Sequence, residues 1–224
     1  MENLRYKSVF DIIGPVMIGP SSSHTAGAAR IGKIMRSVFG ELPESLDIHL
    51  YESFAKTFQG HGTDIALVGG VLGMNPDDPD LRSSLRLAHE AGMEVAFIPH
   101  REERAEHPNT ARLVAKKGEH VMSITGISIG GGNIQVTELN GFNISLSMGT
   151  PTLIIVHQDL PGMIAGVTEI LSKHGINIAQ MNVTREAKGE HAIMIIEVDT
   201  PQMDKVIEEE IRALPDLHDV NFFV

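Results

Sequence analysis

The sequence predicts an α+β protein built from two segments with different patterns. Up to about residue 150, helical periods come first and a run of alternating strands follows, so helices and strands are segregated. From Thr152 onward, a strand, a helix, two strands, a helix and a last strand follow in regular order. We therefore predict a first domain at 1–150 and a second at 151–224, each large enough to bury a core.

Hydrophobic periodicity defines the elements of the first segment. A helix is expected directly after the polar stretch that ends at Gly27, because Ile31, Ile34, Met35 and Val38 share one helical face. A short apolar segment, 8–13, precedes that stretch. Further helices are predicted at 63–74 and 81–91, strands at 46–50 and 93–98, and an antiparallel group at 110–116, 121–129, 133–139 and 142–147. Asn140-Gly141 and Lys117-Gly118 are hairpin turn signals within this group.

The second segment has a ferredoxin-like βαββαβ pattern. Strands are predicted at 153–156, 176–185, 191–199 and 220–224, and helices at 163–174 and from Pro201 to Leu214. The loop before the first helix and the Gly-Ile-Asn-Ile stretch after it closely resemble an ACT domain, a regulatory module that often binds amino acids. That resemblance implies a ligand loop containing Asp159, Gly162 and Asn177.

Composition excludes several classes of function. The formal net charge is -11, from 18 Lys+Arg and 29 Asp+Glu, which argues against nucleic acid or an anionic membrane as the main partner. The longest apolar run, from Ile65 to Met74, is too short to cross a membrane, and Asp11 interrupts the apolar patch near the start. We expect a cytoplasmic protein. The chain has no cysteine, so it cannot supply thiolates for a disulfide, a zinc site or an iron–sulfur cluster.

The most informative polar stretch is Gly19–Gly27, which contains Ser21, Ser22, Ser23, His24 and Thr25. It lies where a loop becomes a helix, and Ser22 or Ser23 is expected to cap that helix. The positive end of the helix dipole then favours a small anion such as a carboxylate. The alternative is an ordinary helix cap with a spare histidine.

Two other histidine clusters have a similar context. Each of the three histidines has a threonine and a Gly or Pro within three residues, whereas the other eight keep an ordinary structural interpretation. Thr63 is expected to cap a helix. The candidate residues in these two clusters are His61, Thr63, Asp64, His107, Asn109 and Thr110.

Three histidines could bind zinc, but they come from separate loops, and Asp64 is the one obvious supporting carboxylate. Acid–base chemistry with hydroxyl groups orienting a small polar substrate suits them better.

A fourth feature, Gly126–Asn133, has three consecutive glycines between two strands. They allow either a close approach to a ligand or partner, or simply a wide hairpin.

Together, Gly-Pro-Ser-Ser-Ser-His-Thr at 19–25, Gly-His-Gly-Thr-Asp at 60–64, His-Pro-Asn-Thr at 107–110 and Gly-Ile-Ser-Ile-Gly-Gly-Gly at 126–132 resemble one family. It is the β subunit of iron–sulfur-dependent L-serine dehydratases (L-serine deaminases), and the resemblance covers essentially the whole chain. It implies an allosteric-substrate-binding-like first domain. It also implies a lyase that converts L-serine to pyruvate and ammonia in serine catabolism and gluconeogenesis. A partner α subunit would carry the cysteines that bind a [4Fe-4S] cluster.

The same resemblance implies roles for individual residues. His24, His61 and His107 would face the cluster across the subunit interface, and no residue of this chain would bind metal. His61 is our choice for the general base. His24, with Ser22 and Ser23, would hold the substrate carboxylate. His107, with Asn109, would assist the leaving group or orient the substrate. The substrate-binding set implied is Ser21, Ser22, Ser23, Thr25, Thr63, Asp64, Asn109 and Thr110.

Two other functions fit parts of the sequence. A stand-alone amino-acid sensor would use the ACT domain and need neither cysteine nor a catalytic set, although it would not need three histidines either. A zinc hydrolase would require metal in the isolated chain. Whatever the function, an exposed sheet edge of the ACT domain could pair with a second copy of the chain, which would give a homodimer.

Overall fold

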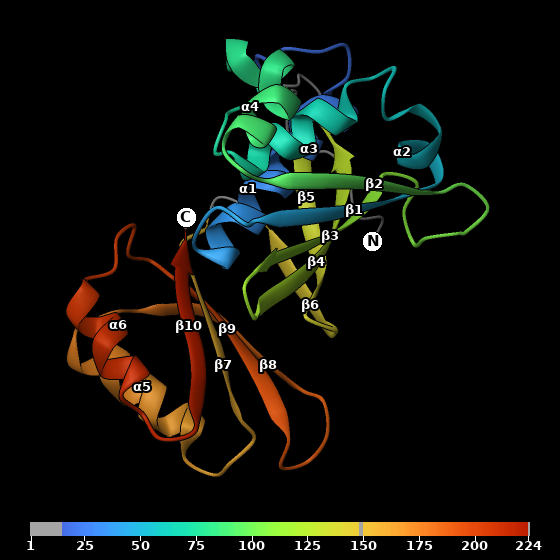
Figure 1. Cartoon of the computed structure of the whole chain (residues 1–224). Coiled ribbons are helices and arrows are strands. Elements are labelled where there is room, and N and C mark those ends of the chain that lie inside the picture. Colours follow the sequence, from blue (N-terminus) through green and yellow to red (C-terminus); the bar gives the residue numbers. More distant parts are fainter. Residues whose placement is uncertain (1–14, 148–149, 224) are drawn as a thin grey trace, which may run out of the picture. The chain divides into compact units, whose positions relative to one another are not determined.

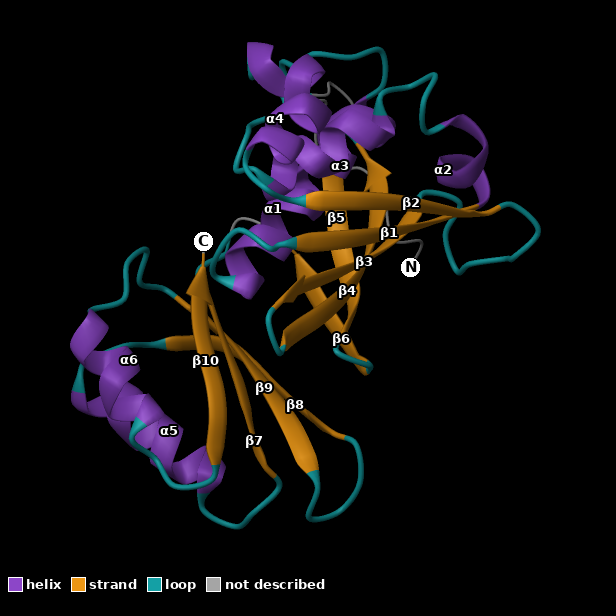
Figure 2. Ribbon diagram, viewed as in Figure 1, coloured by secondary structure: helices purple, strands orange, loops and turns teal. Residues whose placement is uncertain are grey.

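The computed structural model describes residues 15–147 and 150–223, and the chain divides into two compact units between Leu146 and Ser147. The division lies four residues before the predicted domain boundary. Both units mix helices and strands, with the helices gathered beside the sheets rather than alternating strictly with them (Figure 2). The predicted α+β class is confirmed. The apolar segment 8–13 lies outside the described residues.

The first unit contains a six-stranded sheet of order β2-β1-β3-β4-β5-β6. β1 pairs parallel with β2 and antiparallel with β3, and the β3–β4 and β4–β5 pairs are antiparallel as predicted. The strands are β1 (Ser45–Tyr51), β2 (Glu94–His100), β3 (Thr110–Lys117), β4 (His120–Gly130), β5 (Asn133–Leu139) and β6 (Phe142–Ser147).

Helices cover one face of this sheet (Figure 1). Leu46, Ile48 and Leu50 of β1 are fully buried, whereas the alternate side chains of the strand are only half-buried. A strand presents successive side chains to opposite faces, so one face belongs to the core and the other is more open. The helices are α1 (Ala28–Phe39), α2 (Glu52–Thr57), α3 (Thr63–Val71) and α4 (Ser84–Glu90), with a π-helical turn η2 (Ser22–Gly27) before α1 and a 3₁₀ turn η3 (Pro79–Ser83) before α4.

Helices α1 and α3 touch almost backbone to backbone. A Cβ atom added at Gly70 would lie 2.0 Å from the Ala29 carbonyl oxygen, and one at Gly32 would lie 2.2 Å from the Leu67 carbonyl oxygen. Only glycine permits this approach. Because α1 follows the Ser21–Thr25 stretch and α3 follows His61, this contact sets the spacing between two of the predicted polar clusters.

Some predicted elements differ in the structure. The helix expected at 81–91 starts as η3, because Pro79 lies at its first turn and the Asp78 side chain accepts a hydrogen bond from the Asp80 N–H, 2.9 Å. Helix α2 is not predicted by periodicity, since it is only six residues long. These changes leave the order of the remaining elements as predicted.

The second unit has the predicted βαββαβ order. Its four-stranded sheet, β10-β7-β9-β8, packs α5 and α6 on one face (Figure 1), over a core that includes Leu153, Ile155, Val167, Met194 and Ile211. The elements are β7 (Thr152–Gln158), α5 (Met163–Lys173), β8 (Ile178–Arg185), β9 (His191–Val198), α6 (Lys205–Arg212) and β10 (Leu217–Phe223).

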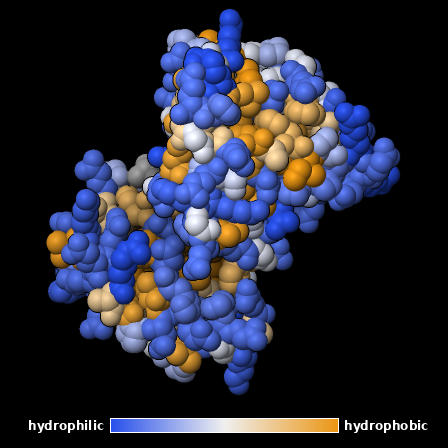
Figure 3. Space-filling view, in the orientation of Figure 1, coloured by the Kyte–Doolittle hydropathy of each residue, from blue (hydrophilic) through white to orange (hydrophobic). Residues whose placement is uncertain are grey.

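The predicted start of the last helix at Pro201 is wrong. Helix α6 begins at Lys205, because the Asp204 side chain caps it by accepting a hydrogen bond from the Val206 N–H, 3.1 Å. Within 15–147 and 150–223, no helix is long and apolar enough to cross a membrane. Hydrophilic residues predominate on the face shown in Figure 3, and hydrophobic ones appear there in small groups.

Candidate active site

The Ser21–Thr25 stretch forms the π-helical turn η2, and Ser21 is its cap. Ser21 has an extended backbone, φ -140°, and its Oγ accepts a hydrogen bond from the His24 N–H, 3.2 Å. The expectation that Ser22 or Ser23 caps the helix is therefore wrong, since both lie inside the turn. They remain half-buried at the start of η2.

His24 is the best-connected side chain of the site. Its Nδ1 lies 3.3 Å from Ser21 Oγ, and its Nε2 lies 3.1 Å from Ser53 Oγ, so both ring nitrogens face hydroxyl groups. The ring also packs edge-on against Phe54 at a centroid distance of 5.2 Å. Burial, and to a lesser extent the nearby His61, lowers the pKa of His24 below its ordinary value. The neutral imidazole is therefore favoured near neutral pH.

His61 lies beside His24. The two ring centroids are 4.8 Å apart and the planes are almost perpendicular, and the Thr25 hydroxyl donates a hydrogen bond to the His61 carbonyl, 3.3 Å. The His61 side chain is exposed. Of the three predicted clusters, these first two meet directly.

The turn that carries His61 leads into α3 through Gly62. Gly62 adopts a left-handed backbone, φ 71°, and is the N-cap of the helix, so the expectation that Thr63 caps it is wrong. Thr63 is fully buried, and its hydroxyl has no hydrogen-bond partner among the described residues. Asp64 is half-buried, and that burial raises the pKa of its carboxyl group.

His107 belongs to a tightly bonded loop. The Asn109 N–H donates to His107 Nδ1, 3.1 Å, and the Thr110 hydroxyl donates to the His107 carbonyl, 2.6 Å. The Asn109 side-chain amide donates to the Ser128 carbonyl, 3.3 Å. The His107 side chain is half-buried. These bonds fix the backbone that follows the imidazole.

Ser53 joins the His107 loop to His24. Its N–H donates to the Pro108 carbonyl, 2.9 Å, while its hydroxyl contacts His24. The three loops thus form one connected set, with His24 touching His61 directly and reaching the His107 loop through Ser53. Ser53 is not among the site residues predicted from the sequence. A usable signal was its place at the carboxyl end of β1, because the ends of the parallel strands β1 and β2 lie together at one edge of the sheet.

Three predicted substrate-binding hydroxyls are buried. Thr25 and Thr63 are fully buried and Thr110 is 5% exposed. Those of Thr25 and Thr110 hydrogen-bond to the carbonyls of His61 and His107. The Thr25 and Thr110 hydroxyls therefore hold the histidine loops in place, whereas the buried Thr63 hydroxyl has no partner among the described residues.

The glycine-rich stretch forms the expected hairpin between β4 and β5. Gly130, Gly131 and Gly132 all have positive φ, and the Gly132 carbonyl accepts a hydrogen bond from the Arg30 guanidinium, 2.6 Å. In β4, Ser128 packs so closely on η2 that a Cβ at Gly27 would lie 2.0 Å from Ser128 Oγ. The hairpin therefore supports the turn that carries His24.

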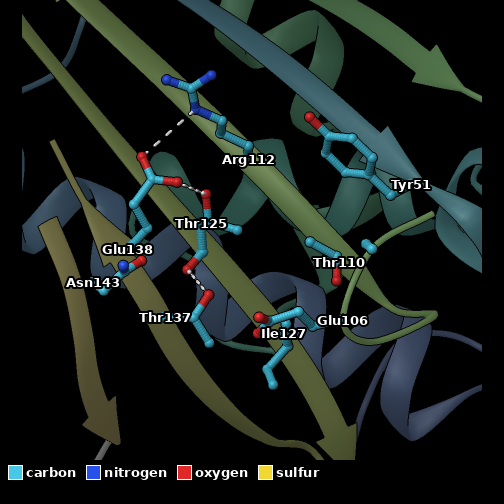
Figure 4. A pocket seen from close by; sticks show the side chains of 10 residues that line it. Tyr51, Glu106, Thr110, Arg112, Thr125, Ile127, Thr137, Glu138 and Asn143 are labelled. Carbon is cyan, nitrogen blue, oxygen red and sulfur yellow. Dashed lines mark hydrogen bonds and ion pairs between the residues drawn. The ribbon is translucent and has the colours of Figure 1, made fainter. Parts of the chain in front are cut away.

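A cavity of about 340 Å³ adjoins the His107 loop, but none of the three histidines lines it. Side chains from neighbouring strands form it, including Tyr51, Arg112, Thr125 and Glu138 (Figure 4). Glu138 lies 4.0 Å from Arg112 Nε and accepts a hydrogen bond from the Thr125 hydroxyl, 2.9 Å. Thr110 belongs to both the cavity wall and the loop.

The predicted ACT ligand residues lie at opposite ends of their sheet. Asp159 follows β7 and binds Arg185 and the Gly189 N–H, each at 3.0 Å, whereas Asn177 precedes β8 and donates to Asp199, 2.6 Å. Strand β9 runs between these two ends, and its eight residues span about 25 Å. Gly162, φ 99°, is the N-cap of α5 beside a cavity of about 250 Å³. One copy of the unit does not bring Asp159 and Asn177 together.

The donor side chains of the described residues do not gather into a metal site. Across residues 15–147 and 150–223, no three His, Asp or Glu side chains lie close enough together to hold a metal ion, and the chain has no cysteine. The described residues therefore offer no donor set that fits a [4Fe-4S] cluster or a zinc site.

The sequence profile of the serine dehydratase beta chain family matches residues 8–139, which include all three histidine loops and the glycine-rich hairpin. The chain belongs to this family. The ACT domain profile matches residues 151–216, so the second unit is an ACT domain.

Relatives extend this family relationship over almost the whole chain. A Bacillus subtilis (strain 168) protein named probable L-serine dehydratase, beta chain, is 48% identical over 216 residues, 96% of each chain. The L-serine dehydratase, beta chain, of Peptoniphilus asaccharolyticus is 36% identical over 87% of this chain and 88% of its own length. L-serine dehydratase 2 of Escherichia coli (strain K12) is 34% identical over 64% of this chain but only 36% of its own length.

Proposed function

We propose that this chain is the β subunit of an L-serine dehydratase, which converts L-serine to pyruvate and ammonia. The observation that supports it most is the contact between His24 and His61, connected through Ser53 to the His107 loop, in a member of the serine dehydratase beta chain family. The dehydratase relatives cover the chain almost end to end.

His61 is the candidate for the general base. Its exposed imidazole is accessible, whereas both ring nitrogens of His24 already face serine hydroxyls. In the proposed reaction, His61 takes the α-proton of serine and the β-hydroxyl leaves as hydroxide, which gives an enamine. An iron of the partner's cluster would supply the Lewis acid that accepts this hydroxide. The enamine rearranges to an imine, and water hydrolyses the imine to pyruvate and ammonia.

The other two histidines are candidates for binding and orientation. His24, whose ring nitrogens contact Ser21 and Ser53, would position the neighbouring half-buried Ser22 and Ser23, and their hydroxyls would hold the substrate carboxylate. His107 and Asn109 would orient the hydroxyl end of the substrate. Asp64, whose pKa is raised by burial, stands in the first turn of α3, next to the His61 turn.

A partner α chain completes the proposed enzyme and would hold its [4Fe-4S] cluster. This chain has no thiolate for such a cluster. The E. coli relative supports a separate partner chain, because this chain matches only 36% of that longer protein. We also propose that the protein is cytoplasmic, that it acts in serine catabolism and gluconeogenesis, and that its two domains span residues 1–150 and 151–224.

Anaerobic co-expression with a cysteine-bearing α chain tests this function. A brown complex that forms pyruvate from L-serine is the expected result. In that complex His61→Asn should lower kcat by about 10² to 10⁴-fold, the usual contribution of a general base. His89→Asn, on the exposed side of α4, is the matched control and should keep normal turnover. Normal turnover of His61→Asn would rule out His61 as the base.

We also propose that the ACT domain works as a pair. Asp159 and Gly162 lie at one end of its sheet and Asn177 at the other, so a small ligand could meet both sets only if a second copy supplies one of them. The exposed edge strand β8 is available for such pairing. Sedimentation with and without L-serine tests this.

A colourless chain that binds serine without an α chain would favour the stand-alone amino-acid sensor instead of the dehydratase subunit.

A further inference from the structure

Ser53 contacts the ring nitrogen of His24 that Ser21 does not contact. Ser53 Oγ lies 3.1 Å from Nε2, and Ser21 Oγ lies 3.3 Å from Nδ1. Ser21 Oγ already accepts the His24 backbone N–H, so its own proton is available for Nδ1. From this network we assign the Nε2–H tautomer, with Ser53 Oγ as the acceptor.

The backbone around Ser53 holds the His107 loop as well. The N–H groups of Ser53 and Phe54 point at the Pro108 carbonyl, at 2.9 and 3.4 Å. Glu52 Oε1 accepts a hydrogen bond from the Ala105 N–H, 3.0 Å. Three consecutive residues therefore bind the loop at two points, one before and one after His107.

Glu52 gives this junction its shape. Its backbone is left-handed, φ 42°, a conformation that is unfavourable for a residue other than glycine. The bend turns the chain sharply between the end of β1 and the start of α2. It places the Ser53 hydroxyl against His24 while its N–H reaches Pro108. Strain of this kind persists where surrounding contacts enforce it.

We infer that Ser53 is a positioning residue that orients His24 and sets its spacing to the His107 loop. The inference rests on the proposed function for its effect on catalysis. Ser53 acts through its two neighbours: its hydroxyl fixes the His24 ring, and its N–H fixes the Pro108 carbonyl. The Phe54 N–H also reaches the Pro108 carbonyl, whereas the contact at Nε2 of His24 depends on the Ser53 hydroxyl.

The experiment compares Ser53→Ala and Ser53→Thr with the wild type. In the complex with the α chain, Ser53→Ala should lower kcat by about 10 to 100-fold, the usual result of a small misplacement, with a smaller change in KM. Ser53→Thr keeps a hydroxyl and should recover most of the loss. Ser83→Ala, at the start of α4 and away from the site, is the matched control and should behave as the wild type.

A spectroscopic readout separates positioning from activity. In the full chain without its partner, the ¹⁵N shifts of the His24 ring should show the Nε2–H tautomer, and Ser53→Ala should convert part of it to Nδ1–H. The other ten histidines report whether the variant is folded. Unchanged kcat and an unchanged His24 tautomer in Ser53→Ala overturn the inference, as does equal impairment of Ser53→Ala and Ser53→Thr. If the wild-type complex forms no pyruvate, the proposed function fails, yet the tautomer still decides the role of Ser53.

Discussion

Replacing Gly70 by alanine should force α1 and α3 apart. The new Cβ would lie 2.0 Å from the Ala29 carbonyl oxygen and 2.9 Å from Gly32 Cα. To reach even a tight contact of about 3 Å, the helices must separate by about 1 Å, because backbone atoms cannot rotate away as a flexible side chain can. His24 and His61 lie just before these two helices and should separate with them.

The cost follows from two opposing effects. Alanine is favoured over glycine in a helix by about 1 kcal/mol. Overpacking costs about 1 to 3 kcal/mol, and a backbone clash belongs at the upper end of that range. The expected net loss is about 2 kcal/mol, which lowers Tm by about 4 to 8 °C for a chain of this size.

Thermal unfolding of Gly70→Ala and wild type measures this loss. The matched control is Gly166→Ala in α5, where a Cβ would meet only the methyl groups of Leu214 at 3.3 and 3.5 Å. That variant should change stability by less than about 1 kcal/mol and leave the His24–His61 pair intact. An unchanged Tm for Gly70→Ala, or an equal drop in both variants, would refute the reasoning.

Three further substitutions test single contacts. His61→Asn removes one of the two influences that lower the pKa of His24, so that pKa should rise toward its ordinary value in an NMR titration. Because His24 resists protonation in the folded wild type, its contribution to stability is fully present above the pKa of His24 in the unfolded chain. That contribution falls as the pH drops toward the lower pKa of His24 in the folded chain, and His61→Asn should weaken this fall. Thr110→Val loses the 2.6 Å hydrogen bond to the His107 carbonyl and should lower the free energy of unfolding in urea by about 1 kcal/mol; an unchanged free energy would contradict this. Ser128→Ala removes a buried hydroxyl without a partner among the described residues, so a stability equal to or about 1 kcal/mol above wild type is expected, and a clear loss would contradict this.

Local patterns predicted most of the elements. Alternation located β1 and the antiparallel strands, and the three-to-four-residue period located α1, because both signals lie within a short window of sequence. The capping residues were predicted less well. Ser21, Gly62 and Asp204 cap helices that were assigned to neighbouring residues, since several adjacent Ser, Thr or Pro residues are equally suitable in sequence.

By itself, the sequence determined the α+β class, the three histidine motifs and the lack of any thiolate ligand. Only the tertiary structure decided that His24 meets His61, that Ser53 links them to His107, and that Asp159 and Asn177 are far apart in one copy. The physical reason is that these relations depend on non-local packing. The α1–α3 glycine contact and the parallel β1–β2 pair join residues that no single window of sequence contains together.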